Sequence, residues 1–134
     1  MDAAAALADL TEISSQVETA ALLSSEGRVL ASSFGDDASA ERLAGAARSL
    51  LAAAEAVPIG SGRTLTQLQV ALRGGSVFVV SEGEHVLAAT TSADPTTGLV
   101  LYDLRTCLRA LDAAEPEAAP KPAPRRRRKK TADA

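Results

Sequence analysis

Residues 22–32 carry the pattern that decides the fold, Leu22-Leu23-Ser24-Ser25-Glu26-Gly27-Arg28-Val29-Leu30-Ala31-Ser32. Two apolar runs flank a short polar segment that contains a glycine, and this composition is typical of two strands joined by a tight turn. The first run extends back to Thr19 and the second extends forward to Ser33. We therefore predict a β-hairpin over residues 19–33, with its turn at Ser25-Glu26-Gly27.

Amphipathic helices and three further strands are predicted on both sides of this hairpin. Apolar residues recur every three or four positions over residues 3–17, and again from about residue 37 or 39 to residue 57, just before Pro58. Strands are predicted over 64–72, 76–81 and 86–91, and Asp94-Pro95 opens a last helix with Asp94 as its cap. This order, α-β-β-α-β-β-β-α, predicts a single α+β domain with a five-stranded, mostly antiparallel sheet.

Charge separates a domain from a tail. Residues 1–114 hold 7 arginines and no lysine against 14 acidic residues, a net charge of −7, whereas residues 115–134 carry +4. The second segment combines closely spaced prolines with six consecutive cations and cannot bury an apolar core. We expect residues 1–114 to form the domain and residues 115–134 to be a disordered Pro/Ala-rich linker and polybasic tail.

Composition excludes several classes of protein. The longest apolar runs fall far short of the roughly 20 residues that span a membrane, and the N-terminus lacks the pattern of a secretory signal. Aromatic residues make up only 2% of the chain, which argues against a surface that stacks nucleic-acid bases. We expect a soluble, cytoplasmic protein.

No constellation of residues points to catalysis or to a metal. Gly60-Ser61-Gly62-Arg63 lacks the Gly-Lys-Ser/Thr ending of a phosphate-binding loop, and one cysteine with one histidine cannot build a zinc site. Cys107 lies on the apolar stripe of the last helix and is predicted to be core, His85 is predicted to lie in a turn, and Asp36-Asp37 is predicted to start a helix. We expect no enzyme activity, no cofactor and no metal.

Three segments in this order carry a family resemblance: the hairpin at residues 22–32, the second-helix run at 40–54, and Asp94-Pro95-Thr96-Thr97-Gly98-Leu99-Val100. Together they resemble the Roadblock (dynein light chain) domain, and within it the bacterial MglB-like branch, over about residues 3–112. Thr97 departs from the apolar residue that many relatives carry. The resemblance implies the second helix on one face of the sheet and the terminal helices on the other. It also implies homodimers through the second helix and third strand, regulation of small Ras-like GTPases, and no cofactor.

The predicted second helix and third strand offer residues for such a dimer. Opposite its leucines the helix carries small side chains, at Gly45, Ser49, Ala52 and Ala56, where a solvated face usually carries charges. A second helix would approach such a stripe closely; the alternative is compositional, since the chain holds 29 alanines. On the third strand, Gln67 and Gln69 alternate with apolar residues, which suits either a sheet edge that pairs with a second copy or an ordinary half-buried strand.

Charged residues beside this stripe are candidates for contacting a partner: Glu41, Arg48 and Glu55 on the helix, and Arg63 in the following loop. We expect Arg105 and Arg109, on the last helix, to form a solvated face. The function expected by resemblance is a homodimeric regulator that binds a small Ras-like GTPase and modulates its nucleotide cycle, GTPase activation included. The alternatives are a non-catalytic adaptor or scaffold in a bacterial signalling complex, and a PAS-like sensory module.

The basic run of the tail consists of Arg125, Arg126, Arg127, Arg128, Lys129 and Lys130. Consecutive cations next to prolines suit weak, salt-sensitive contact with an anionic membrane surface or with nucleic acid. The alternatives are a solubilising tail and one that contacts an acidic partner, its own domain included.

Overall fold

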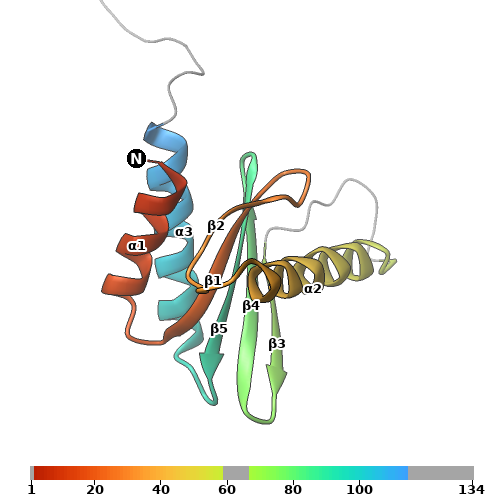
Figure 1. Ribbon diagram of the computed structural model, residues 1–134. Coiled ribbons are helices and arrows are strands. Elements are labelled where there is room, and N and C mark those ends of the chain that lie inside the picture. The colour runs from red at the N-terminus through yellow and green to blue at the C-terminus, as the bar shows by residue number, and fades with distance from the viewer. Residues whose placement is uncertain (1, 59–66, 115–134) are drawn as a thin grey trace, which may run out of the picture.

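The computed structural model describes residues 2–58 and 67–114 of the chain, which form three helices and five strands (Figure 1). In chain order these elements are α1 (Ala3–Ile13), β1 (Val17–Ser24), β2 (Val29–Ser32), α2 (Asp37–Glu55), β3 (Gln67–Leu72), β4 (Gly75–Glu82), β5 (His85–Ser92) and α3 (Thr97–Ala114). Among these helices, none is long and apolar enough to cross a membrane.

The predicted hairpin is confirmed as β1 and β2. Its turn is held by Ser24, whose backbone N–H donates to the Arg28 carbonyl at 2.9 Å. The Ser24 hydroxyl oxygen also accepts from the backbone N–H groups of Glu26 and Arg28, each at 3.2 Å. Gly27 has a φ of +89°, which a residue with a Cβ rarely adopts. The polar segment between the two apolar runs therefore forms a closed turn.

All strand pairs of the sheet are antiparallel, in the order β2-β1-β5-β4-β3. β1 and β5 lie inside the sheet, whereas β3 lies at one edge and β2 at the other. Of the two alternatives left open for the third strand, the structure shows the sheet edge. An edge strand presents unpaired backbone groups along one side, which another strand can bind.

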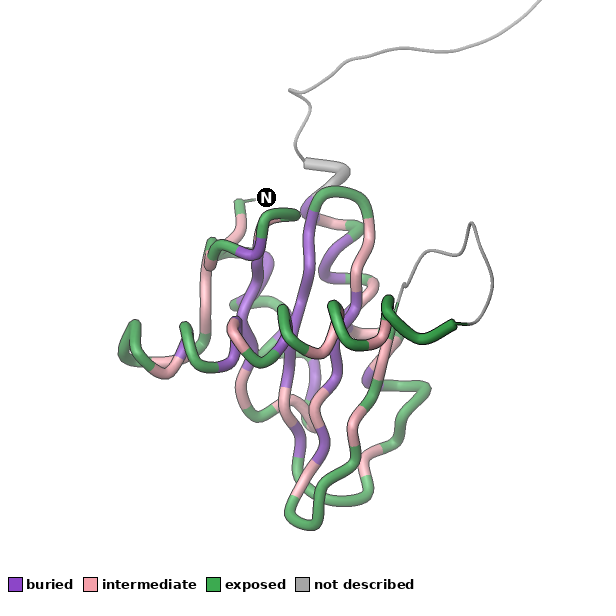
Figure 2. Tube along the Cα trace, turned by 90° about the vertical axis from the view of Figure 1, so that its right-hand side faces the viewer, coloured by how far each residue is buried: buried purple, intermediate pink, exposed green. Residues whose placement is uncertain are grey.

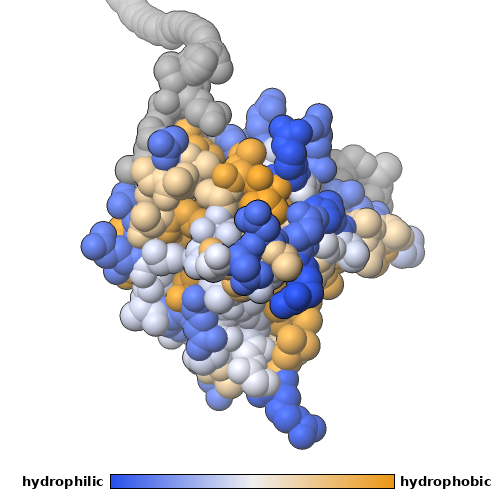
Figure 3. All heavy atoms as spheres, viewed as in Figure 1, coloured by the Kyte–Doolittle hydropathy of each residue, from blue (hydrophilic) through white to orange (hydrophobic). Residues whose placement is uncertain are grey.

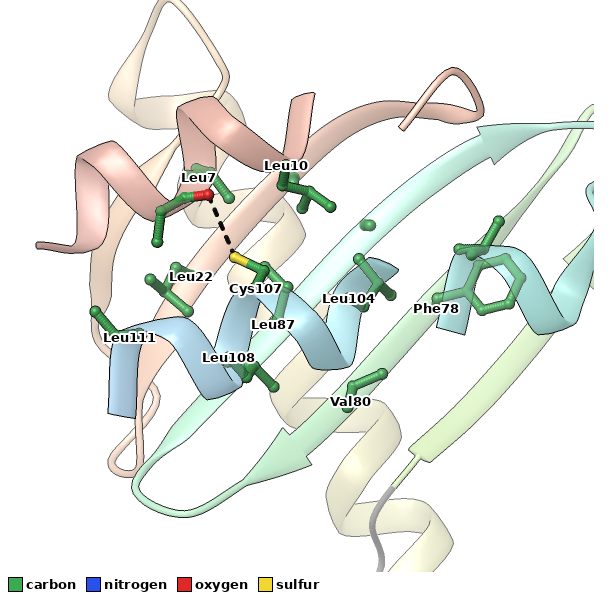
Figure 4. Close-up of a cluster of buried hydrophobic side chains, with 14 residues drawn as sticks. Leu7, Leu10, Leu22, Phe78, Val80, Leu87, Leu104, Cys107, Leu108 and Leu111 are labelled. Atoms are coloured by element: carbon green, nitrogen blue, oxygen red, sulfur yellow. Dashed lines mark hydrogen bonds between the residues drawn. The ribbon is translucent and has the colours of Figure 1, made fainter. Parts of the chain in front are cut away.

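The two faces of the sheet have separate cores, and α1 and α3 cover one of them together (Figure 1). Phe78, the largest fully buried side chain of the described residues, lies in this core among leucines and valines of the sheet and α3 (Figure 4). Cys107 lies there too and donates its S–H to the Ala6 carbonyl at 3.4 Å, so its predicted core position is confirmed. The buried stripe of α3 consists of Val100, Leu104, Cys107, Leu108 and Leu111.

The other face is covered by α2, which packs on Ala21 and Leu23 of β1, Val79 of β4, and Val86 and Ala88 of β5. The helix begins as predicted, because the Asp36 carboxylate accepts a hydrogen bond from the Ser39 backbone N–H at 2.7 Å. The same hydrogen bond lowers the pKa of Asp36. The division expected from the resemblance, with α2 opposite the two terminal helices, is thus confirmed.

Three helix boundaries differ from the prediction, the smallest difference being that α2 ends at Glu55 instead of residue 57. α1 ends at Ile13, four residues early, because the Ser14 hydroxyl oxygen accepts from the backbone N–H groups of Gln16 and Val17 at 3.4 and 3.3 Å and turns the chain into β1. Ile13 is consequently 70% exposed. At the other end of the domain, α3 begins at Thr97, and Asp94 has a φ of +58° and does not cap it.

Candidate functional site

The C-terminal half of α2 is less buried than its N-terminal half and packs against the core on this face of the sheet through the half-buried Leu50 and Leu51. The buried residues of this helix, Ala40, Leu43, Ala44 and Ala47, all lie in its first eleven positions. In Figure 1 the helix runs outward from the strands toward its C-terminal end, and in Figure 2 the C-terminal part of its trace carries the colours of exposed and intermediate residues. Contacts of α2 are mainly with β1, β2 and β5. Among the described residues, the part of this face formed by the edge strand β3 is therefore left largely without a covering helix.

The predicted small-residue stripe lies on this outer part of the helix. Ser49, Ala52 and Ala56 are exposed, and Gly45 is half-buried. A Cβ at Gly45 would lie 3.6 Å from the Arg48 guanidinium, an ordinary contact. Small side chains and exposure together leave the α2 backbone open to close approach by another element.

The two glutamines of β3 do not face α2. The Gln67 side-chain carbonyl accepts from the Arg105 guanidinium, and the Gln69 side-chain carbonyl accepts from the Thr97 hydroxyl at 3.3 Å. Both side chains are exposed, yet both turn toward α3. The predicted interface set therefore divides between two sides of the sheet edge.

The apolar residues of β3 lie on the opposite face, beside α2. Leu68 packs against the α2-side core, and the alternation of a strand places Val70 and Leu72 on the same face. Leu72 is 60% exposed, and Leu68 and Val70 are half-buried. Sequence reasoning named the glutamines and missed this apolar row, although the alternation that singled out one set also defines the other.

Arg48 joins α2 to the hairpin turn. Its guanidinium donates to the Gly27 carbonyl at 2.5 Å and pairs with the Glu41 carboxylate at 2.6 Å. A Cβ on Gly27 would lie 2.5 Å from Arg48 Cδ, so the arginine side chain lies directly over the glycine. Its side chain is 42% exposed. Arg48 is thus exposed, as a partner-contacting residue must be, and it also joins α2 to the hairpin turn.

A pocket of about 310 Å³ lies between α2 and two hairpin turns. Arg48, Ala52 and Glu55 line it from the helix, Glu26 and Gly27 from the first turn, and Gly83 and His85 from the second. Arg48 and Glu55, predicted for partner contacts, thus lie beside Ala52, predicted for the dimer. Arg63, the remaining candidate for partner contact in the loop after the helix, lies outside the described residues. His85 is not in a turn as expected: it is buried at the first position of β5, across from Glu82.

The arginines of α3 do not form a simple solvated face. Arg105 and Arg109 both bind the Glu82 carboxylate, each at 3.0 Å, and Arg105 is only 23% exposed. The hydrogen bond from Arg109 is the main cause that holds the pKa of Glu82 below its usual value, and Arg105 adds to it. These contacts fasten α3 to the end of β4.

The described residues offer little for catalysis or metal binding. In residues 2–58 and 67–114, no three His, Cys, Asp or Glu side chains gather in a way that would hold a metal ion. Burial, with a smaller effect of Asp9, raises the pKa of the Cys107 thiol to about 11 and keeps it protonated near neutral pH.

Comparison with known proteins agrees with this architecture. The sequence pattern of the Roadblock/LC7 domain matches residues 4–92. A Roadblock/LC7 domain from Streptomyces avermitilis superimposes with a TM-score of 0.74 at 21% identity, covering 84% of this chain and 97% of that one.

Two solved structures of MglB share the fold. Myxococcus xanthus MglB gives a TM-score of 0.61 at 14% identity, covering 88% of this chain and 87% of its own. The gliding protein MglB of Thermus thermophilus gives a TM-score of 0.61 at 20% identity, covering 85% of this chain and 88% of its own. Curated protein sequences give no match. The chain, as its hairpin and helices indicated, belongs to the Roadblock/LC7 domain family.

Proposed function

We propose that this protein is a homodimer that binds a small Ras-like GTPase and modulates its nucleotide cycle, without catalytic residues of its own. The observation that carries the proposal is the exposed part of the surface around α2 and β3 in the residues that the structure describes. It combines the exposed small residues Ser49, Ala52 and Ala56 with the apolar row of β3. Family membership supports the same function.

A second copy suits this surface for two reasons. A two-fold axis brings identical surfaces together, so a small-residue helix stripe meets another small-residue stripe. Exposed Leu72 and the half-buried Val70 would be covered in the same contact, beside the open edge of β3. A solved structure described as MglB with a tetrameric arrangement, 19% identical, also has this fold.

The substitution Ala52→Arg tests the dimer. A long cation within the stripe leaves no room for a neighbouring helix, so sedimentation should shift from dimer toward monomer while circular dichroism stays unchanged. Ala4→Arg, at an exposed position of α1 on the far side of the sheet, is the matched control and should leave the dimer intact. A wild-type protein that sediments as a monomer at high micromolar concentration would refute the dimer.

The GTPase is tested with the Ras-like protein encoded nearest to this chain. Single-turnover GTP hydrolysis is measured with the wild type, with Glu55→Lys and with Glu12→Lys. Glu55 is exposed at the end of α2 and lines the pocket, while Glu12 is exposed on α1. We expect Glu55→Lys alone to weaken the effect on hydrolysis. Arg48 is unsuitable for this test, because its replacement also breaks the tie to the hairpin turn.

Binding with no change in hydrolysis or nucleotide release would favour the adaptor or scaffold function instead. In that case Glu55→Lys would still reduce binding in a pull-down with purified GTPase, while the hydrolysis rate would be the same with and without this protein. Absence of binding by the wild type in either nucleotide state would contradict both functions for that GTPase.

A further inference from the structure

A shallow groove runs between α1 and α3 on the face of the domain opposite α2. It has a volume of about 80 Å³ and is lined by Leu10, Ile13, Cys107 and Ala110 as its apolar part and by Asp9 and Asp103 as its charged part. Figure 3 shows hydrophobic surface over the two helices, with hydrophilic residues beside it. The groove is separate from the surface assigned to the dimer and the GTPase.

The charges around this groove are acidic. α1 contains Asp9 and Glu12 and no basic residue, and Asp103 is the charged residue of α3 that lines the groove. The two arginines described on α3 turn the other way, toward Glu82. The pocket beside α2 also has two acidic residues, but Arg48 lines it as well. A cationic segment is therefore favoured more strongly between α1 and α3 than beside α2.

Apolar exposure continues along the same side of α3. Leu99, Asp103, Thr106 and Ala110 share one side by the helical repeat, and Leu99 is 48% exposed. Tyr102, one turn before Thr106, is 65% exposed. Arginine side chains suit such a surface, since their methylene groups cover apolar residues and their guanidinium groups stack on an aromatic ring and pair with carboxylates.

The chain itself supplies a matching segment. Residues 125–130 are six consecutive cations, and they begin 11 positions after Ala114, where α3 ends. Eleven extended residues reach about 36 Å, and the 18 residues of α3 span about 27 Å. The end of α3 and the start of α1 lie at the same end of the molecule (Figure 1). The cations are thus able to reach the full length of the groove.

We propose that the basic run Arg125, Arg126, Arg127, Arg128, Lys129 and Lys130 binds the α1–α3 groove of its own domain, with its cations paired to Asp9 and Asp103. A tethered segment has an effective concentration in the millimolar range, so individually weak surface ion pairs are enough to populate the bound state. The interaction is electrostatic and weakens as salt rises.

Carbodiimide coupling, which joins a carboxylate to an amine, locates the contact in the full chain. All three lysines of the protein, Lys121, Lys129 and Lys130, lie in the last 14 residues, so every lysine cross-link reports on that segment. At low salt we expect mass spectrometry to find Lys129 and Lys130 joined mainly to Asp9 and Asp103. An equimolar mixture of ¹⁴N- and ¹⁵N-labelled protein should give cross-links within one copy. Links spread evenly over the acidic residues, or links between copies, overturn the proposal.

Limited trypsin cleavage after residues 125–130 measures the protection that binding gives. The isosteric variant Asp9→Asn/Asp103→Asn, checked for folding by circular dichroism, should raise this cleavage rate roughly fivefold, as expected for two lost surface ion pairs. Glu26→Gln/Glu84→Gln removes the same charge from two exposed turn positions and should not change the rate. The proposal is overturned if trypsin cleaves the wild type as fast as a free peptide of residues 115–134. It is also overturned if the two double variants change the cleavage rate equally.

Discussion

Gly27 and Arg48 show how a single residue pair fixes the relation of the hairpin to α2. The glycine has a positive φ, its carbonyl accepts from Arg48, and the space above its Cα is filled by the arginine side chain. The positive φ and the Arg48 side chain over the Cα both disfavour a side chain at position 27. The contact joins residues 21 positions apart, so no local periodicity signals it.

The substitution Gly27→Ala should therefore destabilise the domain. The methyl group would meet Arg48 and the backbone would be held in a left-handed conformation, which together cost about 1–3 kcal/mol of unfolding free energy. Urea unfolding followed by circular dichroism measures the loss.

Gly35→Ala is the matched control, because a Cβ at Gly35 would meet no atom within 4 Å. Its unfolding free energy should stay within about 0.5 kcal/mol of the wild type. Equal midpoints for the two variants would contradict the close contact at position 27.

Among the elements, α3 is fastened at one end by Glu82. Two arginines one turn apart on the helix converge on a single carboxylate at the end of β4. The folded state lowers the pKa of this carboxyl from its usual value of 4.5, first through Arg109. The stabilisation is therefore present above that value and is lost as the pH falls through the lower, folded pKa.

The variant Glu82→Gln tests this pH dependence. The wild type should lose more stability than the variant between about pH 6 and about pH 3, since only the wild type has this carboxylate to protonate. Urea midpoints at several pH values provide the comparison, with Glu84→Gln as the control at an exposed position of the turn after β4. Parallel pH profiles for Glu82→Gln and the wild type would argue against the ion pairs.

Sequence periodicity predicts the helices and strands but not the side-chain contacts that join them, such as Arg48 to Gly27 and Arg109 to Glu82. The stripes of α2 and α3 and the hairpin all follow from local patterns of apolar and turn residues, whereas the edge position of β3 is one of two alternatives that the pattern leaves open. The end of α1 depends on the Ser14 hydroxyl, and the start of α3 is accompanied by a hydrogen bond from the Thr96 backbone N–H to the Gln16 side chain at 2.6 Å. Local periodicity predicts a solvated face at Arg105 and Arg109 and does not show their partner Glu82, which lies on a different element.

At the scale of the whole molecule, net charge affects how fast the protein associates with its partners. Residues 1–114 carry −7, so a partner surface with basic patches is attracted from a distance. The charged residues can be read from the sequence, but the surface that they surround cannot. The apolar row of β3 and the pocket beside Glu55 form only when the sheet and α2 pack together.

This charge predicts the salt dependence of GTPase binding. Raising ionic strength should slow association more than it speeds dissociation, because screening acts mainly on the approach of the two proteins. Stopped-flow or surface-based kinetics at several salt concentrations measures both rates. A dissociation rate that changes more steeply with salt than the association rate would place the charges inside the contact itself.

The buried thiol of Cys107 has a consequence for experiments on motion. It is the single cysteine of the chain, it is 6% exposed, and it lies between α1 and α3 with a pKa of about 11. In the native protein it should react slowly with thiol reagents, and faster reaction requires α1 to detach from α3. Without any engineered label, the rate of thiol modification under native conditions thus reports how often this helix opens, and comparison with global unfolding would show whether α1 separates before the sheet does.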